Sequence, residues 1–313
     1  SHPERRVFED LRQGNVGCVT VTCGVWDDTT EALDHIAQWR DAVRANADLV
    51  AIGRSRAEIE QIIASGRTAI VLGFQNTDQF QGRIRYIELF ADLGVRVVQL
   101  TYNNQNAIGG SCYEPHDSGL ARFGREVVRE MNRVGMLIDL SHVGERTALD
   151  VIALSERPVA VTHANPASLY PHRRNKSDKL IRALAEQGGV IGCALYPNIA
   201  GGPDTTLEAW IDMVAWTVEL AGIDHVGFGS DKSINGTQAD LDWMRMGRWT
   251  REVDYGAGSA TNPGRPKPFE WFQTMADYPR VIEGLRRKGF SPDEIEKLAS
   301  GNWLRVFGAT FGT

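Results

Sequence analysis

The sequence predicts an α/β protein of the TIM-type (β/α)8 barrel class. Short runs of apolar and β-branched residues alternate along the chain with longer stretches of helical periodicity. The runs are apolar at nearly every position, which is typical of parallel strands covered by helices on both faces. No GxGxxG or Walker loop follows any run, so a doubly wound nucleotide-binding sheet is the weaker alternative.

Eight runs are expected to form the strands of this barrel. Several of the helical stretches between them end at a glycine placed directly before the next run, as helix ends commonly do. In chain order the runs cover residues 16–22, 49–53, 68–74, 95–102, 136–142, 158–163, 189–196 and 225–231. Eight such units in a chain of 313 residues agree with the usual size of these barrels, about 250 residues or more.

A single barrel domain is expected over residues 1–313, because no linker or low-complexity tract divides the chain. The segment 232–268 follows the last run and is rich in Gly, Pro and aromatic residues. Loops of this length are usually functional or disordered, and the aromatic residues favour an ordered lid. These aromatic residues are Trp243, Trp249 and Tyr255. Residues 269–310 are predicted to form closing helices.

The composition is that of an ordinary globular protein, with 42% hydrophobic and 24% charged residues. The formal net charge of -6, without a basic cluster, argues against a nucleic-acid-binding surface. No stretch reaches the roughly 18 apolar residues of a membrane span, and the N-terminus does not resemble a signal peptide. Cys18 and Cys193 lie in apolar runs and are expected to be buried thiols, which favours a cytoplasmic location.

Polar side chains gather where the predicted strands end, which is the active-site face of a barrel. They are Gln75, Tyr102, Asn103, His142, His163 and Asp231. One histidine at a strand end is usually a hydrogen-bonded structural residue, but two at equivalent positions of successive strands indicate a metal site. Imidazoles with a carboxylate suit a divalent ion such as zinc, which activates water, and Asp231 would act as the general base.

Arg173 and Arg174 follow His163 in the same strand-to-helix loop. Two interpretations of this pair remain open. The arginines form either a solvated basic turn or a guanidinium fork that binds a substrate carboxylate, a role expected of Arg174.

Several long motifs resemble the membrane (renal) dipeptidase family, a branch of the metal-dependent amidohydrolase superfamily. The motifs are "GLARFGREVVREMNRVGMLIDLSHVGERT", "AVTHANPASLYPHRRNKSD", "HVGFGSD" and "LASGNWLRVFG". The resemblance runs from about Leu11 to the C-terminus and implies a barrel, usually a homodimer, in which two zinc ions cleave a dipeptide. It implies that His142 and His163 bind one zinc, that Asp231 is catalytic, and that Arg174 binds the substrate carboxylate.

The sequence departs from this family at the positions of the other zinc. The His-x-Asp motif of the family's first strand has no counterpart here, so that strand either precedes Ser1 or is absent. The bridging glutamate is replaced by Gln75, whose neutral amide cannot offset the repulsion between two cations. A substrate-contacting histidine is replaced by Tyr102. One zinc ion held by His142, His163 and Gln75 is therefore expected.

The function expected from these features is metal-dependent hydrolysis of a small, carboxylate-bearing amide, as in a dipeptidase. Tyr102 and Asn103 are expected to contact the substrate. Because the altered positions surround the reacting centre, a lactam or an N-acyl amino acid is an alternative substrate. A barrel that binds a small molecule without catalysis is a further alternative.

Overall fold

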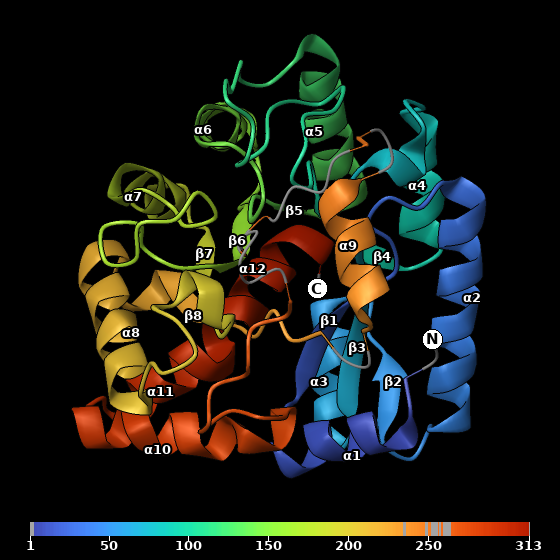
Figure 1. The fold of residues 1–313 in the computed structure, drawn as a ribbon. Helices are drawn as coiled ribbons and strands as arrows, with labels where there is room; N and C mark the ends of the chain where they lie inside the picture. The colour runs from blue at the N-terminus through green and yellow to red at the C-terminus, as the bar shows by residue number, and fades with distance from the viewer. Residues whose placement is uncertain are drawn as a thin grey trace.

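The strands of the computed structural model match the eight predicted runs. The structure describes residues 3–233, 236–247, 250–251, 256, 258 and 264–312. Its strands are β1 (Cys18–Thr22), β2 (Val50–Ile52), β3 (Thr68–Phe74), β4 (Val95–Gln99), β5 (Leu137–Asp139), β6 (Ala160–Ala164), β7 (Val190–Ala194) and β8 (Val226–Gly229). All pairings between them are parallel, so the predicted α/β architecture is confirmed (Figure 1).

The strands form one curled sheet in the order β1-β3-β4-β5-β6-β7-β8. The short strand β2 lies off this path, because it pairs only with the first half of β3, while β4 pairs with the second half. No pairing joins β8 back to β1 in the part of the chain that the structure describes. The sheet is therefore a barrel wall that stays open between its first and last strands.

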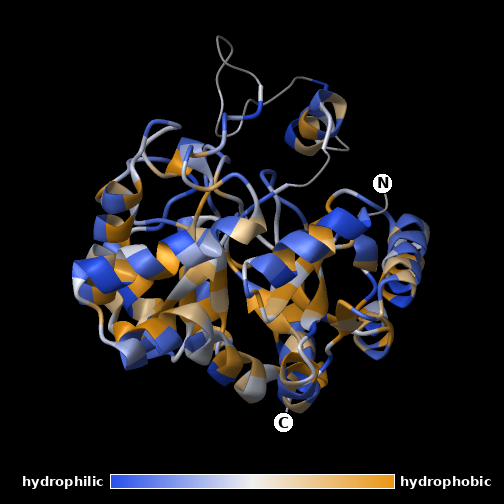
Figure 2. Ribbon diagram, turned by 90° about the horizontal axis from the view of Figure 1, so that it is seen from below, coloured by the Kyte–Doolittle hydropathy of each residue, from blue (hydrophilic) through white to orange (hydrophobic). Residues whose placement is uncertain are grey.

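Most of the helices cover the outer face of the sheet, and in the described part of the chain six α-helix N-termini are capped by Ser, Thr or Asp side chains. The helices are α1 (Arg5–Gln13), α2 (Thr29–Ala45), α3 (Arg56–Ala64), α4 (Arg85–Asp92), α5 (Arg122–Val134), α6 (Glu145–Leu154), α7 (Asp178–Glu186), α8 (Leu207–Ala221), α9 (Gln238–Met246), α10 (Tyr278–Lys288), α11 (Pro292–Glu296) and α12 (Asn302–Phe311). Figure 2 shows the apolar strands at the centre and the polar helix faces outside. None of the described helices combines the length and the apolar character needed to cross a bilayer.

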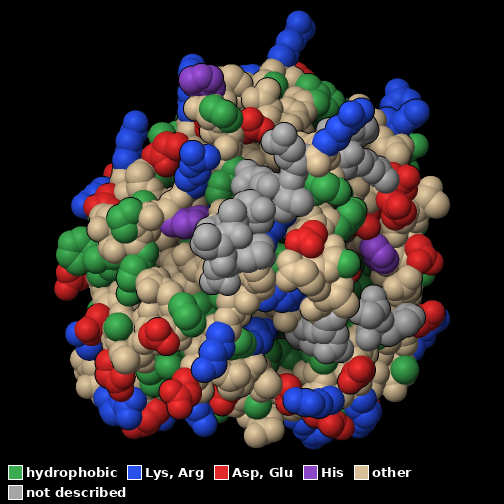
Figure 3. Space-filling model, in the orientation of Figure 1, with side chains coloured by type: hydrophobic (Ala, Val, Ile, Leu, Met, Phe, Trp, Pro, Cys, Tyr) green, Lys and Arg blue, Asp and Glu red, His purple; other side chains and the backbone are tan. Residues whose placement is uncertain are grey.

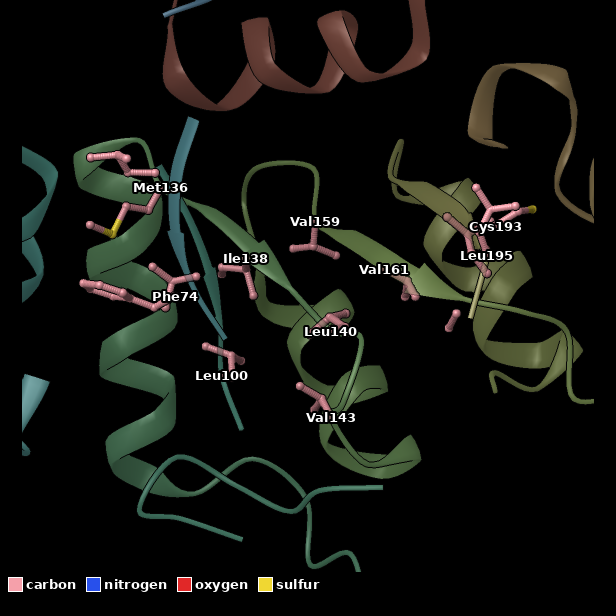
Figure 4. Close-up of a cluster of buried hydrophobic side chains, with 14 of the residues drawn as sticks. Phe74, Leu100, Met136, Ile138, Leu140, Val143, Val159, Val161, Cys193 and Leu195 are labelled. Atoms are coloured by element: carbon pink, nitrogen blue, oxygen red, sulfur yellow. The ribbon is translucent and has the colours of Figure 1, made fainter. Parts of the chain in front are cut away.

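The larger hydrophobic core lies between the sheet and the outer helices, and a smaller one lies where α12 packs against the inner face of the sheet. Every residue of β3, β5 and β7 is buried. Figure 4 shows how side chains from neighbouring strands, such as Phe74, Ile138 and Val161, point into this layer. The core fixes the strands and thereby the positions of the side chains at their carboxyl ends.

Trp210 and Trp216 of α8 give a matched test of this packing. Trp210 is 0% exposed and its indole donates to the carbonyl of Ala194 at 3.0 Å, whereas Trp216 is 41% exposed. Trp210→Ala is expected to lower the free energy of unfolding by about 3–5 kcal/mol, and Trp216→Ala by about 0.5 kcal/mol or less. Urea denaturation measures both, and equal losses would contradict the assignment of Trp210 to the core.

A cavity of about 1030 Å³ follows the open edge between β1 and β8 through the barrel. It reaches from Phe8 and Phe307 at the amino ends of the strands to the site residues at their carboxyl ends. Thr20 and Thr22 of β1 are exposed to it, unlike the inner strands. Cys18 is accordingly half-buried, so its expected full burial was wrong, while Cys193 is buried as predicted.

The predicted lid is described only in part. Within residues 232–268, helix α9 lies over the carboxyl ends of β1 and β3 (Figure 1). The indole of Trp26 donates to the carbonyl of Met244 at 3.0 Å and so fixes α9 to the loop after β1. Trp249 and Tyr255 lie outside the described residues.

Candidate metal and active site

The two predicted histidines lie together at the carboxyl end of the sheet. His142 follows β5 and His163 lies in β6, and these strands pair at Asp139 and Ala160. The two imidazole centroids are 5.4 Å apart, and each residue is 6% exposed. Both line the cavity, which opens as a hollow near the centre of the face in Figure 3.

The two imidazoles have different hydrogen-bond partners. His142 Nδ1 lies 2.8 Å from Asn103 Oδ1, and the Tyr102 ring stacks on the imidazole at 4.1 Å. His163 Nδ1 lies 2.8 Å from Thr162 Oγ1. The buried Nε2 of His163 has no hydrogen-bond partner among the described residues. A buried ring nitrogen without a protein partner is typical of an imidazole that binds a metal ion.

Asp231 lies on the same rim, directly after β8. Its Oδ1 is 3.9 Å from His163 Nε2, and its side chain is 25% exposed. Asp231 and Asn103 both have left-handed backbone conformations, with φ of 48° and 55°. Non-glycine residues rarely adopt this region, and such strained conformations cluster at functional sites.

Burial keeps both histidines neutral. Desolvation lowers the pKa of His142 well below its usual 6.5, and the charge of nearby Arg174 lowers it further. Desolvation likewise lowers the pKa of His163, against the opposing effect of Asp231. Neutral imidazole is the form that binds a metal ion, so the site is ready for a cation near neutral pH.

This burial predicts that the metal-free protein loses stability on mild acidification. Below pH about 6.5 the histidines bind protons in the unfolded state but not in the folded state. The free energy of unfolding therefore decreases as the pH falls. Below pH about 6.5, each histidine is expected to lower the free energy of unfolding by up to about 1.4 kcal/mol per pH unit. Urea denaturation between pH 7.5 and 5 measures this slope. His142→Gln, which does not titrate, should show a smaller slope, and an unchanged slope would contradict the assignment.

Arg174 is buried, so the solvated interpretation of this residue was wrong. It is 3% exposed, and its guanidinium donates to the carbonyls of Ser141 and His163. These bonds link the carboxyl ends of β5 and β6, where the two histidines lie. The side chain still lines the cavity, where its charge attracts an anionic group.

Gln75 also lines the cavity and is half-buried. Its Nε2 donates to Thr22 Oγ1 of β1 at 3.0 Å. Because the amide nitrogen is used in this bond, the side-chain oxygen of Gln75, Oε1, is the atom available to a ligand.

Asp139, Thr162 and Lys176 surround the histidines but were not singled out from the sequence. Asp139 and Lys176 are 3% and 2% exposed, and the Lys176 ammonium donates to the carbonyl of Val143. Burial lowers the pKa of Lys176 to about 8. A usable signal for Asp139 was present, because an acidic residue in the apolar run "MLIDLSH" must find buried partners.

A model of the membrane dipeptidase family (peptidase family M19) matches residues 5–244, which include all eight strands and every predicted site residue. The chain belongs to the membrane dipeptidase family. This membership confirms the family resemblance and places the chain among dipeptidase-like hydrolases.

Relatives in the membrane dipeptidase family match nearly the whole chain. Dipeptidase verJ of Clonostachys rogersoniana is 33% identical over 96% of this chain and 74% of its own length. Dipeptidase tcpJ of Claviceps purpurea is 27% identical over 95% of this chain and 67% of its own. The crystal structure of an amidohydrolase from Pseudomonas aeruginosa is 34% identical, with a TM-score of 0.94 over 100% of this chain and 94% of that chain. The chain spans 52% of the length of a further relative, Dipeptidase aclJ of Aspergillus oryzae, which is 31% identical over 78% of this chain.

The membrane dipeptidase family implies a metal cofactor, and the donors present fit one ion in part. Two neutral imidazoles and the Asp231 carboxylate are ligand types that zinc accepts, and the partnerless Nε2 of His163 points to such a ligand. Among the described residues, no three His, Cys, Asp or Glu side chains are placed as the ligands of one ion. The histidine pair would supply two ligands, and Gln75 or the substrate would have to complete the set.

Proposed function

We propose that this chain is a metal-dependent hydrolase that cleaves a small amide, with a carboxylate-bearing dipeptide as its first candidate substrate. The observation that carries the proposal is the pair of buried, neutral histidines at the cavity, with Nε2 of His163 facing Asp231. The names of the relatives support the substrate class, because verJ and tcpJ are described as dipeptidases.

In this mechanism His142 and His163 would hold the ion, and the side-chain oxygen of Gln75 lies on the same rim. When bound, the ion would supply Lewis acidity, which polarises a carbonyl group and eases the deprotonation of water. Asp231 takes a proton from the attacking water and passes it to the leaving amine. One ion is expected, because Gln75 brings no charge to bridge a second.

Tyr102 and Arg174 act on the substrate. Burial raises the pKa of Tyr102, so its phenol stays protonated and can donate to the oxyanion that develops on the carbonyl. Arg174 attracts the substrate carboxylate, and Asn103 orients His142 through the 2.8 Å contact. A lactam or an N-acyl amino acid remains the second candidate substrate, because Gln75 and Tyr102 lie close to the reacting centre.

Metal analysis combined with a substrate panel tests the proposal. Purified protein incubated with zinc and then desalted is expected to retain about one ion per chain. It is then assayed with L-L and L-D dipeptides, lactams and N-acyl amino acids. Failure to retain any divalent ion would overturn the proposal. Turnover confined to the lactams or N-acyl compounds would replace the dipeptide by the second candidate.

A further inference from the structure

Asp139 forms a buried polar connection between β5 and β6. Its carboxylate accepts hydrogen bonds from the backbone N–H groups of Ser141 and Thr162, both at 3.0 Å and both to Oδ1. It also accepts from the Ser141 hydroxyl at 2.5 Å and, through Oδ2, from the Thr162 hydroxyl at 2.7 Å. Four hydrogen bonds therefore hold this one buried carboxylate between the ends of the two strands.

The donor and acceptor roles in these hydrogen bonds determine which nitrogen of His163 carries the proton. A carboxylate only accepts, so the single hydroxyl proton of Thr162 must point to Asp139 Oδ2. Thr162 Oγ1 can then only accept at its 2.8 Å contact with His163 Nδ1. His163 therefore carries its proton on Nδ1, and the lone pair of Nε2 is left for the cavity.

We propose that Asp139 is a positioning residue that, through Thr162, fixes the tautomer of His163 so that Nε2 can bind the metal ion. The part concerning metal rests on the proposed function, whereas the tautomer is a property of the metal-free protein. His142 differs, because its Nδ1 contacts the neutral amide of Asn103 and not a carboxylate. A carboxylate behind a ligand histidine fixes ring orientation and raises ligand basicity.

The network distinguishes aspartate from asparagine at this position. In Asp139→Asn the side-chain oxygen must face the two backbone N–H groups, because an NH2 group there would oppose both donors. The NH2 group then faces Thr162 and donates to its oxygen. The Thr162 hydroxyl then has two contacts left, His163 Nδ1 at 2.8 Å and Ser141 Oγ at 3.1 Å. Donation to the nearer of them, His163 Nδ1, moves the histidine proton to Nε2. A nearly isosteric change is thus expected to reverse the tautomer.

Nitrogen NMR of the metal-free protein, labelled with 15N-histidine, tests this inference directly. His163 is expected to carry its proton on Nδ1 in the unmodified protein and in Thr162→Ser, which keeps the hydroxyl. Asp139→Asn is expected to move the proton to Nε2, and Thr162→Val to give a mixture of both forms. His142 should keep its tautomer in all four proteins and serves as the internal control. Its spectrum and the melting curve show whether each variant is folded.

Zinc titration of the same proteins gives the second measurement. Asp139→Asn and Thr162→Val are expected to bind zinc about 10–100-fold more weakly than the unmodified protein, with Thr162→Ser restoring most of the affinity. A folded Asp139→Asn protein with the proton still on Nδ1 would overturn the inference. If Asp139→Asn does not fold, equal tautomers in Thr162→Val and Thr162→Ser would overturn it instead. Tautomers as described without zinc binding would leave the inference intact and refute the proposed function.

Discussion

His163→Ala is expected to remove zinc binding and to lower kcat/KM by more than about 100-fold. Loss of a supporting partner of a ligand histidine already costs about 10–100-fold, and loss of the ligand itself should cost more. The Nε2 atom is buried and has no hydrogen-bond partner among the described residues. Metal content after desalting and steady-state kinetics on the best substrate measure both effects.

His116→Ala is the matched control for this experiment. His116 is exposed in the loop between β4 and α5 and does not line the cavity. Its replacement should leave zinc content and kcat/KM unchanged. A His163→Ala protein that keeps its zinc and more than about a tenth of its activity would contradict the role of His163 as a ligand.

Asp231→Asn is expected to lower kcat by about 10²–10⁴-fold, because the amide cannot accept the proton of the attacking water. The change is nearly isosteric, so KM should change little. Zinc should be retained, because both imidazoles remain. This separation of kcat from metal content distinguishes a general base from a ligand, since loss of a ligand reduces both.

Asp204→Asn removes the same charge at an exposed position before α8 and should leave kcat unchanged. The base assignment for Asp231 would be refuted if kcat fell by less than about tenfold in Asp231→Asn. It would also be refuted if the loss appeared in KM alone.

The fold could be predicted from the sequence because parallel strands covered on both faces must be apolar throughout. Each run from 16–22 to 225–231 overlaps a strand of the structure. The closeness of His142 and His163 followed from the same argument, since neighbouring parallel strands end at the same edge. The run 95–102 was longer than β4, because its last residues form the rim of the site.

Other features depend on contacts between segments that are distant in sequence. The open edge beside β1 depends on the position of β8 and was not predicted, although the two threonines make "CVTVT" more polar than the enclosed strand "VIGCA". The bonds of Arg174 to backbone carbonyls depend on how its loop folds back over the strands. The role of Asp139 depends on the register of β5 and β6, which brings its carboxylate to Thr162.

The left-handed backbone conformations of Asn103 and Asp231 lower the stability of the fold at two positions whose side chains belong to the candidate site. An L-residue in that region is less stable than glycine by roughly 1–2 kcal/mol, less for Asn and Asp than for other residues. Selection for thermal tolerance alone would therefore favour glycine at both positions. The resulting proteins would lack the side chain that faces His142 or the carboxylate that faces His163. Engineering for heat resistance should therefore leave these two positions unchanged and act on the outer helices.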